Sequence, residues 1–138
     1  MDLDKLQRVQ NMSAKLIKRA AKFNSTTECL KELHWLPIRK RIEFKILPLV
    51  FLSITGEGPT YLQNLVTLAL VKRAGLQSNS EHIKLHIPFT KLNTFAARSF
   101  SCIGPRQWNK LPGYLKTLPN IHIFKKNLKT YLFKQSDK

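Results

Sequence analysis

The stretch GPRQWNKLP, residues 104–112, combines two prolines, a glycine, a tryptophan and an asparagine. A second stretch, LHWLPIRKRI at residues 33–42, again places a tryptophan close to a proline. A tryptophan among prolines and leucines more often belongs to a hydrophobic core than to a platform on which bases stack. The asparagine beside it is expected to cap backbone groups of a tight turn. The predicted structural joints are Trp35, Pro37, Gly104, Pro105, Trp108, Asn109 and Pro112.

The first half of the chain has the periodicity of helices. Residues 3–23 place apolar side chains on one helical face, which we expect to meet the core, and basic side chains on the other. Ser25 and Glu28 have the spacing of a capping box for a second helix that runs to about Trp35. A third helix should have Pro37 in its first turn. It is apolar on all sides over residues 46–54, which predicts burial.

The last third of the chain is helical as well. A helical pattern begins at Thr94 and is expected to stop near Gly104, after which Pro105 begins a separate one-turn helix. Asn120 has the properties of an N-cap for the final helix, whose apolar residues share a face that we expect to meet the core. These residues are Ile121, Phe124, Leu128, Tyr131 and Leu132.

The middle of the chain is less regular. Residues 59–66 predict a short helix with Tyr61, Leu62 and Leu65 facing inward. Residues 83–87 alternate as a strand does, with residues 68–71 as the candidate partner. The expected fold class is mainly α, a small helical domain with a short β-hairpin or extended segment. We expect one domain over residues 1–138, with a helical half at 1–66, a loop with short strands at 67–93 and a helical half at 94–138.

The net charge is the most unusual feature of the composition. Lys and Arg number 24 against 8 acidic residues, a net charge of +16. Self-repulsion of this size opposes compaction, which favours a polyanionic partner. The excess lies at both ends, with 11 basic and 5 acidic residues over 1–45 and 9 and 1 over 98–138. The alternative is a solvated surface that only keeps the protein in solution.

The sequence offers little for catalysis or metal binding. It contains no Gly-rich phosphate loop and no carboxylate pair spaced for two-metal phosphoryl transfer. The pairs His82–His86 and Cys29–His34 each lack the further ligands of a zinc site, and Cys102 has no marked base beside it. We therefore expect no catalytic residue, no metal and no cofactor.

The same sequence predicts an intracellular protein, nuclear or cytoplasmic. Two widely separated cysteines suit a reducing compartment, and the start MDLDKLQ is not that of a secretory signal. The longest apolar run, ILPLVFLSI, is shorter than the roughly 20 residues that span a bilayer, so no membrane partner is expected.

Basic side chains on the helices and beside the joints are the candidate nucleic-acid contacts, directed mainly at phosphates of RNA or DNA. They are Lys15, Lys18, Arg19, Lys22, Arg39, Lys40, Arg41, Arg106, Lys125, Lys126 and Lys129. We expect the basic faces of the first and last helices to form one groove with residues 39–41.

Five blocks in this order resemble one protein family. They are LQRVQN, LKELHWLPIRKRIEFK, GEGPTYLQNL, ARSFSCIGPRQWNKLP and FKKNLKTYLF, and they extend from about Leu6 to Phe133. Together they resemble the C-terminal region of the polyprotein of non-LTR (LINE-type, jockey-like) retrotransposons. The chain departs from the family pattern at Pro48, and at Gln77, where an arginine is common.

The resemblance implies the tail of a reverse transcriptase, at or just beyond the helical thumb that grips the template–primer duplex. It also implies that the metal-binding aspartates of the palm and the endonuclease are not in this chain. The leading hypothesis is a non-catalytic nucleic-acid-binding helical domain. The alternatives are a structural or protein-interaction module, which would pack against a reverse transcriptase palm or another protein, and a translated transposon remnant without selected function.

Overall fold

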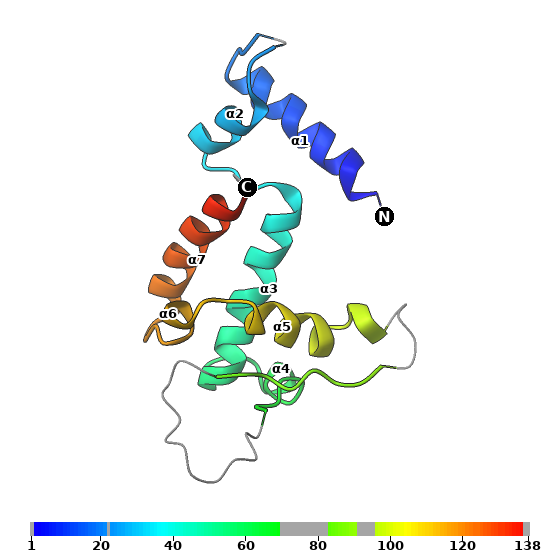
Figure 1. Ribbon diagram of the computed structural model, residues 1–138, viewed down its shortest axis with the longest axis vertical. Helices are drawn as coiled ribbons and strands as arrows, with labels where there is room; N and C mark the ends of the chain where they lie inside the picture. The colour runs from blue at the N-terminus through cyan, green and yellow to red at the C-terminus, as the bar shows by residue number, and fades with distance from the viewer. Residues whose placement is uncertain (1, 22, 70–82, 91–95, 137–138) are drawn as a thin grey trace. The chain divides into compact units, whose positions relative to one another are not determined.

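The computed structural model describes residues 2–21, 23–69, 83–90 and 96–136. The fold is mainly helical, as predicted (Figure 1). Its elements are α1 (Leu3–Ile17), α2 (Thr26–Glu32), α3 (Ile38–Thr55), α4 (Thr60–Gln63), the 3-10 helix η2 (Ala96–Arg98), α5 (Phe100–Asn109), α6 (Gly113–Lys116) and α7 (Ile121–Ser136).

The chain divides into two compact units. Unit 1 comprises residues 1–44 and 128–138, and unit 2 comprises residues 45–127. The divisions lie within α3 and α7, so each of these helices contributes to both units. They do not coincide with the expected boundaries after residues 66 and 93. The expectation of a single domain stays a prediction.

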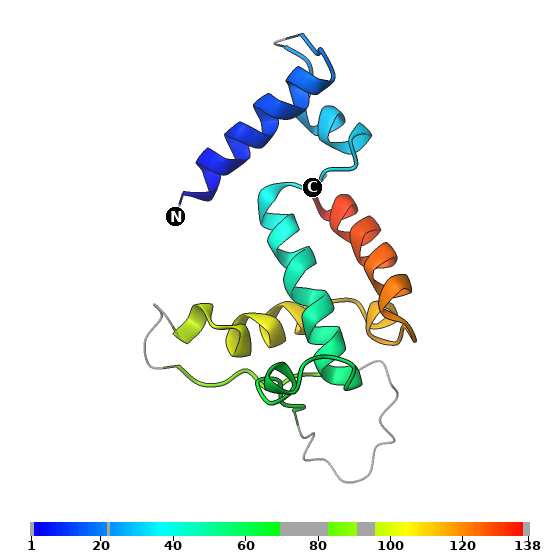
Figure 2. The same ribbon diagram turned by 180° about the vertical axis from the view of Figure 1, so that it is seen from behind.

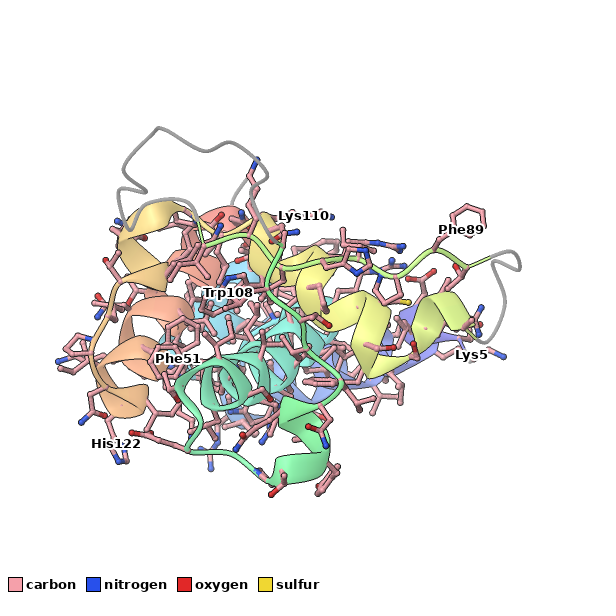
Figure 3. The ribbon with its side chains drawn as sticks, turned by 90° about the horizontal axis from the view of Figure 1, so that it is seen from below. Lys5, Phe51, Phe89, Trp108, Lys110 and His122 are labelled. Carbon is pink, nitrogen blue, oxygen red and sulfur yellow. The ribbon has the colours of Figure 1, made fainter. Side chains whose placement is uncertain are left out.

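Three aromatic rings form the centre of unit 2. Phe51 of α3 stacks on Phe124 of α7 with ring centroids 4.6 Å apart, and Trp108 of α5 lies 6.0 Å from Phe124 and 6.5 Å from Phe51. Trp108 is 1% exposed, which supports its assignment to the core. In Figure 3 the Phe51 and Trp108 rings point into the interior, whereas Phe89 points outward.

Asn109 attaches an extended segment to this core. Its Oδ1 accepts a hydrogen bond from the Leu85 backbone N–H and its Nδ2 donates to the Leu85 carbonyl, both at 2.9 Å. The Trp108 Nε1–H donates to the Ile83 carbonyl at 3.2 Å. The prediction that Asn109 caps its own turn is therefore wrong, since its partner lies 24 residues away.

The same segment makes the expected pairing with the residues before it. Leu85 forms an antiparallel bridge with Leu68, flanked by hydrogen bonds from Ala69 N to Lys84 O and from His86 N to Thr67 O. Within the described residues the hairpin is reduced to this bridge. Residues 70 and 71 of the predicted partner strand, and most of the predicted loop at 67–93, lie outside the described residues.

Residues 100–109 form one helix, not two. The helix α5 continues through Gly104 and Pro105, both of which are buried, and it crosses α3 (Figures 1 and 2). A Cβ on Gly104 would lie 2.9 Å from Cγ2 of Val50, so glycine permits a close approach of the two helices. The helix loses one backbone hydrogen bond at Pro105, but it keeps Gly104 and Trp108 on one face because they are four residues apart. The expected stop at Gly104 is therefore wrong.

The long helix α3 lies where the sequence pattern predicted a helix, but the burial predicted over residues 46–54 is only partly observed, since Leu49 is 41% exposed. Pro48 lies inside it and is buried, together with Leu47, Val50 and Phe51. It ends at Gly56, whose φ of +77° is the left-handed conformation that glycine adopts at a helix terminus. The short helix α4 differs from the prediction, because Tyr61 and Leu65 are exposed, Leu62 is only half-buried and none of its residues is fully buried. A single turn presents no continuous apolar stripe for packing.

The other two proline joints precede helices. The carbonyl of Pro37 accepts the Arg41 N–H at 2.8 Å, and that of Pro112 accepts the Leu115 N–H at 3.2 Å. Pro37 thus lies just before the first turn of α3, so the prediction that it lies within that turn, which was based on its missing N–H, is wrong. Each proline thus supplies a carbonyl acceptor to the first turn of the helix that follows it.

Helices α1 and α2 of unit 1 end in the same way. Arg19 has φ +49° and His34 has φ +54°. The Ala20 N–H bonds the Lys15 carbonyl and the Trp35 N–H bonds the Leu30 carbonyl, which is the pattern of a Schellman motif. The first helix therefore ends at Ile17, before the predicted residue 23, and Lys22 lies outside the described residues. Ser25 occupies the N-cap of α2, but its side chain makes no capping bond, so the predicted capping box is not formed.

The two helices pack through small and polar residues. Ala14 of α1 is fully buried with Cys29 and Leu30 of α2, and the joint Trp35 packs against this cluster. Gln10 is also buried, and its Nε2 donates to the Leu36 carbonyl at 2.9 Å. The predicted inward direction of the apolar face of α1 is wrong, because these contacts turn Gln10 and Ala14 inward. The final helix agrees with its prediction, since Phe124, Leu128 and Leu132 are all buried.

Replacing Trp108 with alanine should destabilise the protein by about 3–5 kcal/mol, because it removes a fully buried ring and leaves the Ile83 carbonyl without its partner. Urea unfolding followed by circular dichroism measures this loss. An unfolding midpoint equal to that of the wild-type protein would show that Trp108 is not part of the core.

Replacing Asn109 with aspartate should cost about 1–3 kcal/mol, because a carboxylate oxygen would face the Leu85 carbonyl in place of the Nδ2 donor. The matched control is Asn64→Asp on the exposed surface, which should stay within about 0.5 kcal/mol of the wild type. Equal unfolding free energies for the two variants would contradict a structural role for the Asn109 amide.

Candidate nucleic-acid interface

Three of the predicted nucleic-acid contacts form ion pairs within unit 1. Lys18 pairs with Glu32 of α2, Arg39 pairs with Asp4 at 3.3 Å, and Lys40 pairs with Glu43 at 3.2 Å. The hydrogen bond that Lys18 donates to Glu32, followed by the charge of that carboxylate, raises the pKa of Lys18 above its ordinary value of 10.5. Lys40 also donates to the Gln135 Oε1 at 2.8 Å. The positive charges of these three side chains are therefore partly neutralised by acidic residues of the same chain, which leaves less charge for a polyanion.

Other predicted contacts remain at the surface. Arg19 and Arg41 are exposed in unit 1, where Lys15 and Lys129 are half-buried. Arg106, Lys125 and Lys126 are exposed in unit 2. The expected continuous groove combines residues of both units and stays a prediction.

Unit 1 contains a groove that sequence reasoning did not single out. It has a volume of about 280 Å³ and is lined by Lys31, His34, Thr130, Phe133 and Lys134. Two lysines, a histidine and an aromatic ring surround it, and none of the described residues that line it is acidic. We call these five residues the basic groove.

Local structure places each side of the basic groove. Lys31 lies in the last turn of α2, and Lys134 lies in the last turn of α7. Both positions are also favourable for a lysine beside a helix C-terminus, so their charge alone is not diagnostic. His34 is more informative, because it occupies the left-handed conformation that glycine usually takes. A side chain there costs roughly 1–2 kcal/mol, and it puts an exposed imidazole at the groove.

The basic groove has the components of a single-strand binding site. Such sites combine positive charges that follow the backbone phosphates with aromatic rings on which bases stack. Phe133 is half-buried, so part of its ring is held by the protein and part meets the groove. Neither Trp35 nor Trp108 has this position.

A second cavity of unit 1 has a different character. It has a volume of about 300 Å³ and is lined partly by Asp4, Arg39, Gln7 and Asn11. The Asp4 carboxylate and the Arg39 guanidinium form an ion pair in its wall. One acid and one base cancel there, so this cavity does not attract a polyanion.

Unit 2 contains an unfavourable pair of lysines. Lys116 is only 9% exposed, and within the described residues it forms no ion pair. Burial, and then the charge of Lys84, lower the pKa of Lys116 below its ordinary value of 10.5. Lys84 is held in place because its carbonyl accepts the Ala69 N–H at 2.9 Å. An anion between the two ammonium groups would relieve this repulsion.

The described residues contain no cluster of three or more His, Cys, Asp or Glu side chains that could hold a metal ion. Cys29 and Cys102 are buried free thiols. In the part of the chain that the structure describes, no helix has the length and apolar character needed to cross a membrane.

Comparison with protein-family models, with curated proteins and with solved structures finds no match to this chain. The candidate interface therefore depends on the residues described above. Sequence reasoning missed the basic groove because Lys31 of α2 and Lys134 of α7, which both line it, are 103 residues apart in the chain. The sequence signal that could have indicated the basic groove is an aromatic residue near basic ones, since Phe133 lies between Lys129 and Lys134.

Replacing Lys116 with methionine should raise the free energy of unfolding at neutral pH by on the order of 1 kcal/mol, because it removes a buried charge and its repulsion with Lys84. The exposed Lys110, which points outward in Figure 3, provides the control Lys110→Met, expected within about 0.5 kcal/mol of the wild type.

The same change should flatten the alkaline limb of the stability profile. The unfolded state holds the Lys116 proton up to about its ordinary pKa of 10.5, and the folded state releases it earlier, so wild-type stability rises with pH across that window. Urea unfolding at several pH values measures the difference between the two proteins. A variant that is less stable than the wild type at neutral pH would contradict the assignment.

Proposed function

We propose that this chain is a non-catalytic nucleic-acid-binding module that holds single-stranded RNA or DNA through its phosphates. The observation that carries the proposal is the basic groove, in which Lys31, His34 and Lys134 lie around Phe133 and none of the described lining residues is acidic. A phosphate near the lysines and a base on the phenylalanine ring would use every component of the groove.

The charge of the whole chain supports the same proposal. Residues 45–127 contain 11 basic and two acidic residues, and the complete chain has a net charge of +16. Lys116 and Lys84 provide a second position where an anion would lower the energy of the folded protein. Contacts of this kind recognise phosphates and carry little sequence information.

The origin of the chain is part of this proposal. The five sequence blocks support descent from the C-terminal region of a non-LTR retrotransposon reverse transcriptase, separated from the palm that polymerises. A module of that origin would hold template or target strands and would not perform chemistry on them. Its acids support this division of roles, because Asp4, Glu32 and Glu43 are engaged in ion pairs with basic side chains.

The test titrates the complete chain with fluorescent single-stranded and duplex oligonucleotides at several salt concentrations. Lys134→Gln should weaken single-strand binding and reduce the log–log salt slope by about 0.7, the value for one phosphate contact on a single strand. The control Lys45→Gln removes the same charge from an exposed site outside the basic groove and should change the slope less.

Phe133→Leu separates stacking from charge. It should lower single-strand affinity by about 1–3 kcal/mol per stacked base while leaving the salt slope unchanged. Circular dichroism checks that the variant remains folded. Wild-type affinity that ignores salt, or the absence of binding at low salt, would overturn the proposed function, whereas an unaffected Phe133→Leu variant would exclude only the stacking contact.

A further inference from the structure

An apolar stripe on α1 remains uncovered. Leu6, Val9, Met12, Leu16 and Ile17 are 40%, 62%, 73%, 80% and 55% exposed. On a helix these positions lie on one side over three turns, and they extend about 16 Å along the axis. We call them the α1 stripe.

Polar contacts hold the α1 stripe outward. Gln10 donates to the Leu36 carbonyl, and the Gln7 Oε1 accepts the Ile38 backbone N–H at 2.8 Å. Rotating α1 to bury its stripe would break both bonds and would remove Ala14 from its contact with Cys29 and Leu30. Buried polar groups left without partners are costly, so the stripe stays on the surface of unit 1.

Basic residues follow one border of the α1 stripe. Lys5, Arg8 and Lys15 are spaced by three and seven residues and lie beside Met12 on the helix. Lys5 lies 3.6 Å from Asp2, an exposed pair that leaves its charge largely available. The surface is therefore an aliphatic strip with a positive edge.

The combination of an aliphatic strip and a positive edge favours some binding partners of the α1 stripe over others. In an antiparallel second copy centred on Met12, Lys5 would face the copy's Arg19, and a parallel copy would bring Arg8 against Arg8. Like charges across an interface are repulsive, and only 8 acidic residues are present in the chain to offset them. An anionic membrane suits the positive edge, but helices that lie in a membrane interface typically carry Lys and Arg across the whole polar face. The side of α1 away from the stripe instead carries Gln7, Gln10 and Ala14, which bond to or pack against the rest of unit 1.

We propose that the α1 stripe binds an amphipathic helix of a partner protein, whose apolar face covers Leu6, Val9, Leu16 and their neighbours and whose acidic edge faces Lys5 and Arg8. The strip is as long as three helical turns, which matches the seam between two paired helices. This surface is distinct from the basic groove, so the two sites can act independently.

Two synthetic helical peptides of about 20 residues test the proposal. Both carry the same leucine stripe, and their flanking positions are glutamate in one and lysine in the other. Fluorescence anisotropy with the complete chain at about 0.15 M salt should show binding to the glutamate peptide at least about tenfold tighter than to the lysine peptide. Leu16→Ser should weaken that binding by about tenfold or more, whereas Leu65→Ser, at an exposed leucine of unit 2, should not change it.

A charge exchange makes the test specific. The double variant Lys5→Glu with Arg8→Glu should reverse the preference and bind the lysine peptide more tightly. The acid at position 5 lies in the first turn of α1, where the helix dipole favours it, and both changed positions are exposed, so folding should be retained. The control Lys45→Glu with Lys125→Glu makes the same change in net charge at exposed positions elsewhere and should keep the original preference.

Three outcomes would overturn the proposal. They are equal affinity for both peptides, dimerisation of the chain that Leu16→Ser abolishes, and Leu16-dependent binding to vesicles of phosphatidylcholine and phosphatidylserine without binding to the glutamate peptide. Oligonucleotide affinity should be the same in Leu16→Ser and in the wild type. A failure of the helix proposal is thus distinguishable from a failure of nucleic-acid binding.

Discussion

The contact between α5 and the extended segment at residues 83–86 is the constraint on which unit 2 depends. Trp108 and Asn109 are adjacent, and they direct one side chain into the aromatic core and the other onto the Leu85 backbone. An extended segment with a single bridge has few hydrogen-bond partners of its own. The Asn109 amide supplies one donor and one acceptor, which satisfies both backbone groups of Leu85 at once. The helical core and the irregular middle of the chain are thereby joined.

In unit 1 the comparable constraint is polar. The amides of Gln7 and Gln10 bond to the backbone that links α2 to α3, and they determine which side of α1 faces inward. A small residue, Ala14, then meets α2. Burial of these groups is offset by their hydrogen bonds, and the larger aliphatic residues of α1 are left for another contact. The orientation of α1 is therefore set by the hydrogen bonds of its buried amides, and not by the area of apolar surface that could be buried.

Several charged side chains of unit 1 are likewise satisfied by partners within the unit. Acidic residues of unit 1 form local ion pairs with Lys18, Arg39 and Lys40. The positive charge of the basic cluster at residues 39–41 is therefore only partly available to a ligand. Among the described residues, none that lines the basic groove is acidic, and Lys116 forms no ion pair but is close enough to Lys84 to be repelled by its charge. Positions where charge or strain is left uncompensated, such as Lys116 and His34, are those where a ligand has most to contribute.

Local periodicity by itself determined much of this protein. The positions of α3 and α7, the buried stripe of α7 and the burial of Trp108 follow from residue spacing and composition, because neighbours along a helix lie three or four residues apart in the chain. Tertiary structure alone decided the rotation of α1, the partner of Asn109 and the meeting of His34 with Phe133 in one groove. Each of these depends on groups at least 24 residues apart, which no local pattern brings together. For α1 and Asn109 the pairing is set by which buried or partly buried polar atoms can be satisfied, and for His34 and Phe133 by where the tertiary fold places α2 and the end of α7.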